Sequence, residues 1–381
     1  MGFDAIILGL GAMGSAAAYH LAQRGKRVLG FEQFTSPHDK GSSHGGSRII
    51  RQAYWEGAEY IPLVQRSYEL WRQLEKDTGM RLVNITGLLV VGSRDGELVR
   101  HTIEAGSTHS IPFEVLEAGE ISRRFPHFVM QPSDVGVYEP GAGYLVPEDC
   151  IRAHLEVAVR NGAEWRFEEK VLSWSADRDQ VEVRTDKGGY RAAHLVITAG
   201  PWANEALRGV MPLRVTRQVM AWFEPRGGVA DFVAEKFPIF VAEDVYGGAP
   251  LYGFPAVDGP DGGVKAAIHG SDVECTAVGV DRTVSEADIQ RIRTAVTERI
   301  PALDGEVVRA KTCLYTMTPD EHFVIGAHPQ AAICAIACGF SGHGFKFASV
   351  VGEILADLAT TGTTVHPIGL FSPGRFTDRQ A

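Results

Sequence analysis

Apolar and polar positions follow one another along the chain in a pattern that predicts strands and helices in turn. An apolar run at residues 4–9 predicts a buried strand, and the glycine-rich turn after it leads into an amphipathic helix over residues 12–24. The apolar segment "RVLGFE", residues 27–32, predicts a second strand and completes a βαβ unit. A strand, a glycine turn and a helix return together in "CGFSGHGFKFASVVGEILADL", residues 338–358. The chain therefore contains two such glycine turns, one near each end.

A central segment resumes the alternation of helix and strand. Residues 150–165, "CIRAHLEVAVRNGAEW", predict an amphipathic helix, and "QVEVRT" and "AHLVITAG", residues 180–185 and 193–200, predict two strands after it. The stretches between these pieces are mainly strand-like, as in "GLLVVGS", "VMAWFEP" and "VKAAIHGS". We therefore expect an α/β fold with two interleaved domains. A Rossmann-like nucleotide-binding domain is predicted for residues 1–81, 146–210 and 319–381, and a substrate domain with an antiparallel sheet for residues 82–145 and 211–318.

Composition and charge narrow the class of protein. With 381 residues, 45% of them hydrophobic, the chain can bury a large core. Its net charge of −10 and the absence of a basic run argue against a nucleic-acid-binding protein, because neutralising phosphates needs clustered Lys and Arg. The longest apolar stretches reach about half of the ~20 residues that cross a bilayer, so we expect no membrane span. A small molecule is therefore the expected partner.

Three further features of the sequence indicate where the protein is located and whether it binds a metal: the N-terminus, the cysteines and the histidines. The segment "MGFDAIILG" lacks a basic leader and runs directly into the glycine turn, so we expect it to belong to the fold and not to a signal peptide. The five cysteines are an odd number without CxxC pairs, which argues against a disulfide framework or structural zinc. His44, His269 and His343 share no local ligand spacing. These features favour a metal-free protein of the reducing cytoplasm.

The first glycine turn carries a nucleotide-binding motif in its required context. "GLGAMG" supplies Gly9, Gly11 and Gly14 in the GxGxxG spacing, which allows a tight turn, close approach to a pyrophosphate and close packing of helix on strand. Glu32 ends the second strand about 20 residues later, where a carboxylate accepts hydrogen bonds from an adenosine ribose. The motif is common to NAD and FAD sites, so both cofactors stay open at this point.

Arg48 and Arg51 follow a second loop rich in glycine and serine, "GSSHGGSRIIRQAYWEG". If this segment is helical, the two guanidinium groups share one face. They could then hold a carboxylate bidentately, with Glu56 as a local counter-charge. An ordinary ion pair at the surface is the alternative.

Two further pairs place chemical groups on one side of an element. Lys265 and His269 are four residues apart, a spacing that puts both on one face in a strand or in a helix. In "KTCLYTMT", a strand would present the Cys313 thiol and the Tyr315 phenol to the same side. A lone cysteine is more often a small buried apolar residue than a nucleophile, so residue type alone leaves the role of Cys313 open.

Lys346 lies in the second glycine turn, near the predicted start of the last long helix. The positive end of a helix dipole disfavours a cation there unless an anion lies close by. The position therefore indicates a nearby anion.

Taken together, these stretches closely resemble the family of monomeric sarcosine oxidase and N-methyltryptophan oxidase, flavin-dependent amine oxidases of the D-amino-acid oxidase-like superfamily. The resemblance covers nearly the whole chain and rests on "GLGAMG", "PHDKGSSHGGSRIIRQAY", "LYGFP", the Lys265/His269 pair, "CLYTMTPDEHF" and "GFSGHGFKFASVVGE". It implies a FAD-binding domain of the glutathione-reductase-like type. It further implies oxidation of the C–N bond of an N-methyl or cyclic secondary amino acid to an imine, with O2 reduced to hydrogen peroxide.

The resemblance also assigns roles to residues. Cys313 matches the cysteine that binds FAD covalently through the flavin 8-methyl group, and Lys265 matches the lysine that promotes oxygen reduction. Arg51 and Lys346 match the pair that binds the substrate carboxylate. The resemblance thus implies two anions near Lys346, the substrate carboxylate and the negative charge of the reduced flavin. The implied catalytic residues are Lys265, His269, Arg48, Tyr252 and Tyr315, and the implied substrate-binding residues are Arg51, Lys346, Tyr252 and Val241. The implied cofactor-binding residues are Gly9, Gly11, Gly14, Glu32, Ser43, His44, Arg48, Val171, Gly200, Trp202, Cys313, Gly339, Gly342, Gly344, Phe345 and Lys346.

Two departures from the family pattern adjoin the predicted pocket. Ser43 and Gly46 stand where the best-known members carry a histidine and an acid, and the hairpin over residues 241–255 is longer than theirs. Sarcosine, N-methyltryptophan, pipecolate and a glycated amino acid therefore stay open as substrates of an expected monomer.

Two other functions compete with the oxidase. A flavin-dependent dehydrogenase that passes electrons to a partner or quinone does not need an oxygen-activating cation, so Lys265 argues against it. A non-catalytic flavoprotein does not need Arg51, Lys265, His269 and Lys346 together.

Overall fold

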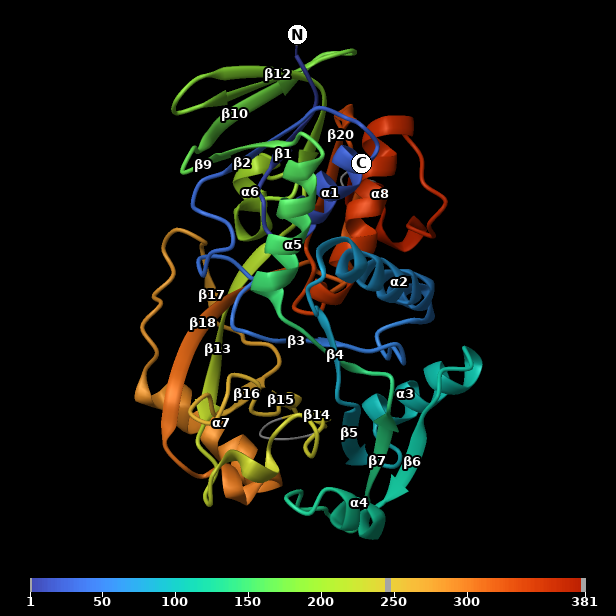
Figure 1. Cartoon of the computed structure of the whole chain (residues 1–381), viewed down its shortest axis with the longest axis vertical. Helices are drawn as coiled ribbons and strands as arrows, with labels where there is room; N and C mark the ends of the chain where they lie inside the picture. Colours follow the sequence, from blue (N-terminus) through green and yellow to red (C-terminus); the bar gives the residue numbers. More distant parts are fainter. Residues whose placement is uncertain (1, 244–247, 378–381) are drawn as a thin grey trace.

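The computed structural model describes residues 2–243 and 248–377, and two sheets dominate it (Figure 1). The first sheet has the strand order β10-β11-β12-β1-β2-β9, and β20, which pairs with β19, joins it at β12. Strand β1 pairs in parallel with β2 and β12, and β12 pairs in parallel with β20. The strands are β1 (Phe3–Leu8), β2 (Val28–Glu32), β9 (Glu164–Phe167), β10 (Val171–Ala176), β11 (Val181–Thr185), β12 (Gly189–Ile197), β19 (Val324–His328) and β20 (Ala331–Cys338).

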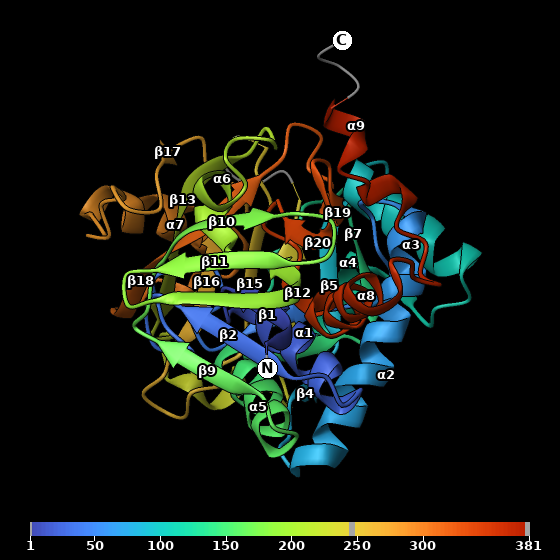
Figure 2. The same ribbon diagram turned by 90° about the horizontal axis from the view of Figure 1, so that it is seen from above.

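Three long helices pack along this sheet. Helices α1 (Ala12–Gln23), α5 (Pro147–Arg160) and α8 (Ala348–Thr361) lie beside one another in Figure 2 and bury a large apolar cluster against the parallel strands. Helix α2 (Ile61–Thr78) packs outside α8. The predicted βαβ unit is confirmed, because β1, α1 and β2 follow one another with parallel strands. Burial of one apolar helix face against the sheet explains why the hydrophobic pattern located these elements.

The second sheet has the order β17-β13-β16-β15-β14-β5-β7-β6, with β18 pairing to β13. Its strands are β5 (Leu88–Ser93), β6 (Glu114–Glu117), β7 (Asp134–Glu139), β13 (Arg214–Phe223), β14 (Ile239–Ala242), β15 (Leu251–Phe254), β16 (Val264–Ile268), β17 (Glu274–Cys275) and β18 (Val307–Met317). It is antiparallel apart from the parallel pair β5 and β14. The α/β fold class with a Rossmann-like part and a second sheet is confirmed, and the exact domain boundaries stay a prediction.

A small sheet and several helices complete the chain. Strands β3 (Arg48–Ile50), β8 (Gly143–Leu145) and β4 (Val83–Ile85) form the small sheet, and Figure 1 shows β3 and β4 between the two large ones. The remaining α-helices are α3 (Glu97–Thr108), α4 (Ala118–Arg124), α6 (Ala203–Ala206), α7 (Glu286–Arg299) and α9 (Gly374–Thr377). The short 3-10 helices are η1 (Ala58–Tyr60), η2 (Gly200–Trp202), η3 (Val229–Asp231), η4 (Pro301–Leu303), η5 (Phe345–Phe347) and η6 (Gly369–Phe371). No helix in the described part of the chain is long and apolar enough to cross a membrane.

The structure corrects one local prediction. Arg48 begins the strand β3, which pairs with β8, and Arg51 follows that strand, so the segment is not helical. Ile49 and Ile50, both β-branched, lie between the two arginines and favour the strand. The two arginines therefore do not share a helical face, and it is the tertiary fold that brings both of them to one cavity.

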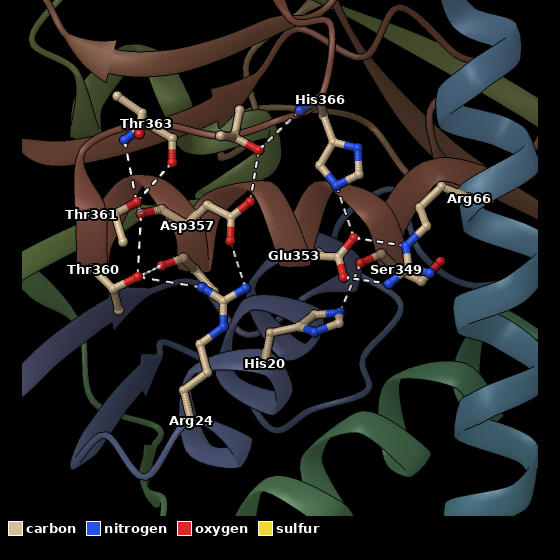
Figure 3. A network of polar contacts seen from close by, with 12 residues as sticks. His20, Arg24, Arg66, Ser349, Glu353, Asp357, Thr360, Thr361, Thr363 and His366 are labelled. Atoms are coloured by element: carbon tan, nitrogen blue, oxygen red, sulfur yellow. Dashed lines mark hydrogen bonds and ion pairs between the residues drawn. The ribbon is translucent and has the colours of Figure 1, made fainter.

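A polar network anchors helix α8, which carries the second glycine turn at its N-terminal end (Figure 3). The Glu353 carboxylate lies 2.7 Å from Arg66 Nη2 of α2 and 2.9 Å from His366 Nε2 of the C-terminal segment. Hydrogen bonds from these two partners outweigh the effect of burial and lower the pKa of Glu353. Asp357, one turn later, pairs with Arg24 at 2.7 Å. Helix α8 is thereby tied to α2 and to the chain just after α1.

Candidate active site

A cavity of about 520 Å³ opens over the first sheet and is lined by both glycine turns. Gly9 and Gly11 reach it from the first turn, and Gly339, Gly342 and Gly344 reach it from the second. Both turns follow parallel strands of one sheet, β1 and β20, so they emerge at the same edge. We call this space the large cavity.

The first turn needs its glycines for two different reasons. Gly9 has φ +91°, and a Cβ there would lie 2.6 Å from the Thr198 carbonyl oxygen. A Cβ on Gly14 would lie 1.8 Å from the Gly9 carbonyl oxygen, so this glycine allows α1 to pack on β1. A Cβ on Gly11 would meet no atom within 4 Å, so its backbone faces open space in the cavity. The three positions match the roles that the motif predicts.

Glu32 closes the same side of the large cavity. Its carboxylate accepts hydrogen bonds from the backbone N–H groups of Leu10, at 3.1 Å, and Phe34, at 3.2 Å. The carboxylate is buried at the end of β2 and lines the cavity next to the first turn. An acid fixed by two amides beside a glycine cradle fits the ribose and pyrophosphate of a dinucleotide. The donor set of this cavity therefore fits FAD.

The second turn holds a tyrosine of the other sheet against its backbone. Gly342 has φ +84°, and a Cβ there would lie 2.4 Å from the Tyr315 ring. Tyr315 comes from β18, so this contact brings the second sheet to the edge of the large cavity. Any side chain at position 342 would separate the two parts of the molecule at this point.

Most predicted cofactor residues line the large cavity, and four do not. Those that line it are Gly9, Gly11, Glu32, Ser43, Arg48, Val171, Gly200, Trp202, Gly339, Gly342, Gly344 and Phe345. Gly14 packs inside the fold, and Cys313 and Lys346 line a neighbouring cavity. The His44 ring is buried and its nitrogens have no hydrogen-bond partner in the described structure. Burial lowers the pKa of His44 to about 3, so the ring is neutral.

A second cavity of about 110 Å³, the small cavity, lies beside the large one and shares Arg48, Tyr315, Gly342 and Phe345 with it. The predicted substrate-side residues Arg51, Val241, Tyr252, His269, Tyr315 and Lys346 all line it. Further lining residues that the sequence pattern did not single out are Ile49, Trp55, Gln218, Met220, Pro250 and Phe254. The fold therefore brings Arg51 and Lys346, from opposite ends of the chain, to one small space.

Arg51 is buried in the small cavity, where it already makes an ion pair, a hydrogen bond to a carbonyl group and an aromatic contact. Its side chain is 2% exposed, and its Nη2 lies 2.6 and 2.8 Å from the two carboxylate oxygens of Glu56. Its Nη1 donates to the Ala53 carbonyl oxygen at 2.8 Å, and its Cζ lies 3.1 Å from the centre of the Trp55 ring. The expected counter-charge Glu56 is thus confirmed, whereas the surface position considered for this ion pair is wrong. An incoming anion has to share Arg51 with Glu56.

Lys346 lies in η5, directly before α8, and faces the same space. Its Nζ donates to the His343 carbonyl oxygen at 2.8 Å and lies 5.0 Å from the centre of the Tyr54 ring, which is also 4.2 Å from Arg51 Cζ. Burial and the nearby Arg51 lower the pKa of Lys346 to about 7, although Glu56 acts in the opposite direction. An anion bound here would restore the charged form.

A hydrogen bond to His343 fixes the position of the Tyr54 hydroxyl. The Tyr54 hydroxyl lies 2.5 Å from His343 Nδ1, and His343 Nε2 lies 3.1 Å from the Glu321 carbonyl oxygen. Burial lowers the pKa of His343 to about 3, so the imidazole is neutral. The Nε2–H must donate to Glu321, so Nδ1 accepts from Tyr54. This fixed pair positions the ring that both cations contact.

Strand β18 presents Cys313 and Tyr315 to one side, as the alternation predicts. Cys313 Sγ lies 3.6 Å from Arg48 Nη2, and the Tyr315 hydroxyl lies 3.4 Å from His269 Nδ1. Burial lowers the pKa of His269 and raises that of Tyr315, so both side chains are uncharged near neutral pH. Tyr252, on β15 of the same sheet, is partly buried, and burial raises its pKa as well.

Lys265 lies beneath the site and lines neither cavity. Its Nζ donates to the carbonyl oxygens of Gly45, at 3.0 Å, and Ser47, at 2.7 Å, and lies 4.1 Å from the centre of the Phe254 ring. Burial, together with the charge of Arg48, lowers its pKa well below the usual range. The carbonyl oxygens and the aromatic face favour the ammonium form and oppose this effect.

The hairpin predicted to be longer than in the family lies partly outside the described residues. It spans residues 241–255 and includes residues 244–247, which the structure does not describe. Among the residues that the structure describes, no group of three or more His, Cys, Asp or Glu could hold a metal ion. Trp55 is the principal residue that sequence reasoning missed, and its only sequence signal is its place next to Tyr54, four residues after Arg51.

Comparisons with known proteins show the family to which the chain is similar. A family model described as FAD dependent oxidoreductase matches residues 4–358. The chain is 48% identical to a monomeric sarcosine oxidase of Streptomyces avermitilis, over 98% of this chain and 97% of that one. It is 32% identical to an N-methyl-L-tryptophan oxidase of Yersinia pestis, over 99% and 100%. The solved structure of NikD, an amino acid oxidase essential for nikkomycin biosynthesis, matches with a TM-score of 0.86 and 25% identity, over 98% of this chain and 97% of that one. The resemblance inferred from the motifs is thereby confirmed.

Proposed function

The chain belongs to the family of FAD dependent oxidoreductases, and we propose that it oxidises the C–N bond of small N-methyl or cyclic secondary amino acids with O2 as the electron acceptor. It is an oxidoreductase that acts on CH–NH bonds, as its sarcosine oxidase relatives are. The observation that carries the substrate class is the meeting of Arg51 and Lys346 in the small cavity. Glu56 balances only one of these two buried cations, so a second anion is needed to balance both.

The lining of the large cavity supports the proposal that FAD binds there. The amides of the first turn, at the start of α1, would hold the pyrophosphate, and Glu32 would hold the ribose. When bound, FAD accepts a hydride equivalent from the substrate and passes two electrons to O2. The turn carrying Gly342 and Gly344, which borders both cavities, would lie next to the reacting end of the cofactor.

We further propose that Cys313 Sγ binds the flavin 8-methyl group covalently. Arg48 supports this role, because it lines both cavities and its Nη2 lies 3.6 Å from Cys313 Sγ, so the thiol lies at the edge of the proposed flavin site. Protein precipitated with acid should then keep its yellow colour. Release of all the flavin as free FAD would contradict the linkage.

The substrate would bind with its carboxylate on Arg51 and Lys346. His269 and Tyr315, both uncharged, also line the small cavity and would orient the amine. Burial of Arg51 and Lys346 strengthens their charged hydrogen bonds to the carboxylate. Lys265 would stabilise the negative charge that develops on O2 as it is reduced.

The products would be an imine, hydrolysed afterwards, and hydrogen peroxide. We also propose a monomer, because several relatives are named monomeric sarcosine oxidase. A cytoplasmic location is supported by five free cysteines.

The test is a peroxide-release assay over a panel of secondary amino acids, with matched amines that lack the carboxylate. Peroxide should form with the amino acids and hardly at all with the simple amines. Equal rates with N-methylamines would overturn the substrate class. Anaerobic reduction of the flavin without peroxide release in air would favour the dehydrogenase instead.

A further inference from the structure

Trp55 forms the wall of the small cavity next to the carboxylate-binding arginine. Its ring centre lies 3.1 Å from Arg51 Cζ, and its side chain packs against the apolar cluster that contains Val241 and Phe254 of the second sheet. The indole therefore bridges the turn after β3 and strands β14 and β15. It is held on one side by a cation and on the other by a sheet.

We propose that Trp55 determines specificity by limiting the side chain that a substrate can carry on its α-carbon. This inference rests on the proposed function, because it assumes a carboxylate held by Arg51 and Lys346. The α-carbon is bonded directly to that carboxylate, so a substituent on it must lie close to Arg51. Since the indole covers the Arg51 guanidinium, such a substituent meets Trp55.

The size of the small cavity supports this assignment. Its volume of about 110 Å³ is well below the roughly 300–1,000 Å³ of pockets that bury drug-sized ligands. A small N-methyl amino acid without a large side chain suits such a space, whereas an aromatic side chain needs the volume that the indole occupies. The enzyme is therefore specific for amino acids with small α-substituents.

A purely structural role for Trp55 makes a different prediction. If the indole only steadied Arg51, its loss would weaken every carboxylate substrate by the same factor. If it limits the α-substituent, its loss improves large substrates relative to small ones. The ratio of two substrates that share the carboxylate and the N-methylamine separates these roles, because any change in carboxylate binding cancels.

The experiment measures kcat/KM for N-methylglycine and N-methylphenylalanine with the flavin-loaded parent and the variants Trp55→Ala and Trp55→Phe. We expect the parent to prefer N-methylglycine. The Trp55→Ala variant should shift the ratio toward N-methylphenylalanine by roughly tenfold or more, and Trp55→Phe by less. Trp165→Ala, which removes a partly buried indole of β9 away from both cavities, should leave the ratio unchanged.

Each outcome decides a separate point. An unchanged ratio in flavin-loaded Trp55→Ala, or a parent that oxidises both substrates equally well, overturns the role of Trp55 and leaves the proposed function standing. A parent whose flavin is reduced by neither of these two but by a cyclic secondary amino acid overturns this inference alone, and one whose flavin is reduced by no secondary amino acid overturns the proposed function with it. Where Trp55→Ala does not fold, Trp55→Leu keeps an apolar side chain in the cluster and gives the same reading.

Discussion

The large and the small cavity share a border but are built from different parts of the chain. The large cavity is bordered by two glycine turns, which supply Gly9, Gly11, Gly339, Gly342 and Gly344, so part of its shape follows from residues that have no side chain. The small cavity is lined by charged and aromatic side chains that arrive from distant segments, among them Arg51, Tyr252 and Lys346. A backbone cradle accepts any dinucleotide of the right shape, whereas the side chains select the substrate.

This difference sets the range of expected mutational effects. Substitutions in the backbone cradle should remove the cofactor altogether, because a Cβ cannot move away from its own main chain. Substitutions in the small cavity should change rates and affinities by measurable factors and leave the cofactor bound. The following tests run from the largest expected effect to the smallest.

The strongest test compares two glycines of the first turn. Gly14→Val should prevent folding, because a Cβ there would lie 1.8 Å from the Gly9 carbonyl oxygen. Gly11→Val should fold, because a Cβ there meets no atom within 4 Å, but its side chain would occupy the cofactor space. The measurements are circular dichroism and flavin absorbance after gel filtration. A folded Gly11→Val protein with full flavin content would show that this turn does not cradle the cofactor.

The next substitution tests Lys265, whose side chain lines neither cavity. Lys265→Met should leave anaerobic flavin reduction by substrate comparatively intact and slow reoxidation by O2 by roughly 10²–10³-fold, since only reoxidation builds negative charge on oxygen. Because the pKa of Lys265 is lowered, the parent's reoxidation should slow as pH rises through that pKa and the ammonium is lost. Stopped-flow measurement of both half-reactions checks this. An unchanged reoxidation rate would remove Lys265 from the mechanism.

The two cavities also differ in how far the sequence could predict them. Gly9, Gly11, Gly14 and Glu32 lie within one βαβ unit, so their spacing alone indicates a nucleotide cradle. The alternation along β18 likewise placed Cys313 and Tyr315 on one side, because strand geometry is local.

The remaining features depend on contacts between distant segments. Arg48 begins a strand because β3 pairs with β8, which lies almost a hundred residues later in the chain. The carbonyl groups that bind Lys265, at Gly45 and Ser47, are even more remote, 220 and 218 residues away in sequence. The sequence did not indicate Trp55, because a single tryptophan four residues after an arginine forms no periodic pattern. Only the family resemblance linked Arg51 with Lys346, since no local pattern spans the chain.

Lys346→Met tests the cation pair in the small cavity. Loss of one charged hydrogen bond, worth about 1.5–3 kcal/mol, should weaken binding of a carboxylate-bearing substrate by roughly 10- to 100-fold. Amines without a carboxylate should lose little further. Lys236→Met is the matched control, because Lys236 forms an exposed ion pair with Asp231. Equal losses for amines with and without the carboxylate would contradict a role in carboxylate binding.

The pH dependence of binding should report Lys346 directly. Its pKa of about 7 in the ligand-free protein must rise when a carboxylate binds, because the anion favours the ammonium form. The Kd of methoxyacetate, which has no ionisable amine, should therefore be constant below pH 7 and increase by up to about tenfold per unit above it. Titrations followed by flavin absorbance measure this. The dependence should vanish in Lys346→Met, and a flat profile in the parent would exclude Lys346 as the titrating group.

Glu56 should give the smallest effect, because it acts on the site in two opposing ways. Its carboxylate occupies Arg51 Nη2 and repels an incoming carboxylate, so Glu56→Gln should strengthen methoxyacetate binding at low pH. Glu56 also acts to raise the pKa of Lys346, so the variant should lose the ammonium form at a lower pH. We expect affinity to improve by about 1.5- to 5-fold well below pH 7, equivalent to ~0.2–1 kcal/mol, and to fall below that of the parent at higher pH.

The crossing of the two binding curves is the decisive feature of the Glu56→Gln experiment. A structural loss would weaken binding at every pH, and simple removal of a competitor would strengthen it at every pH. Only a residue that both competes for Arg51 and supports the charge of Lys346 produces the crossing. Glu69→Gln, an exposed acid of α2 paired with Arg66, serves as the control and should reproduce the parent curve. Parallel curves for parent and Glu56→Gln would show that Glu56 does not couple the two cations, and the small cavity would then bind its anion through each cation independently.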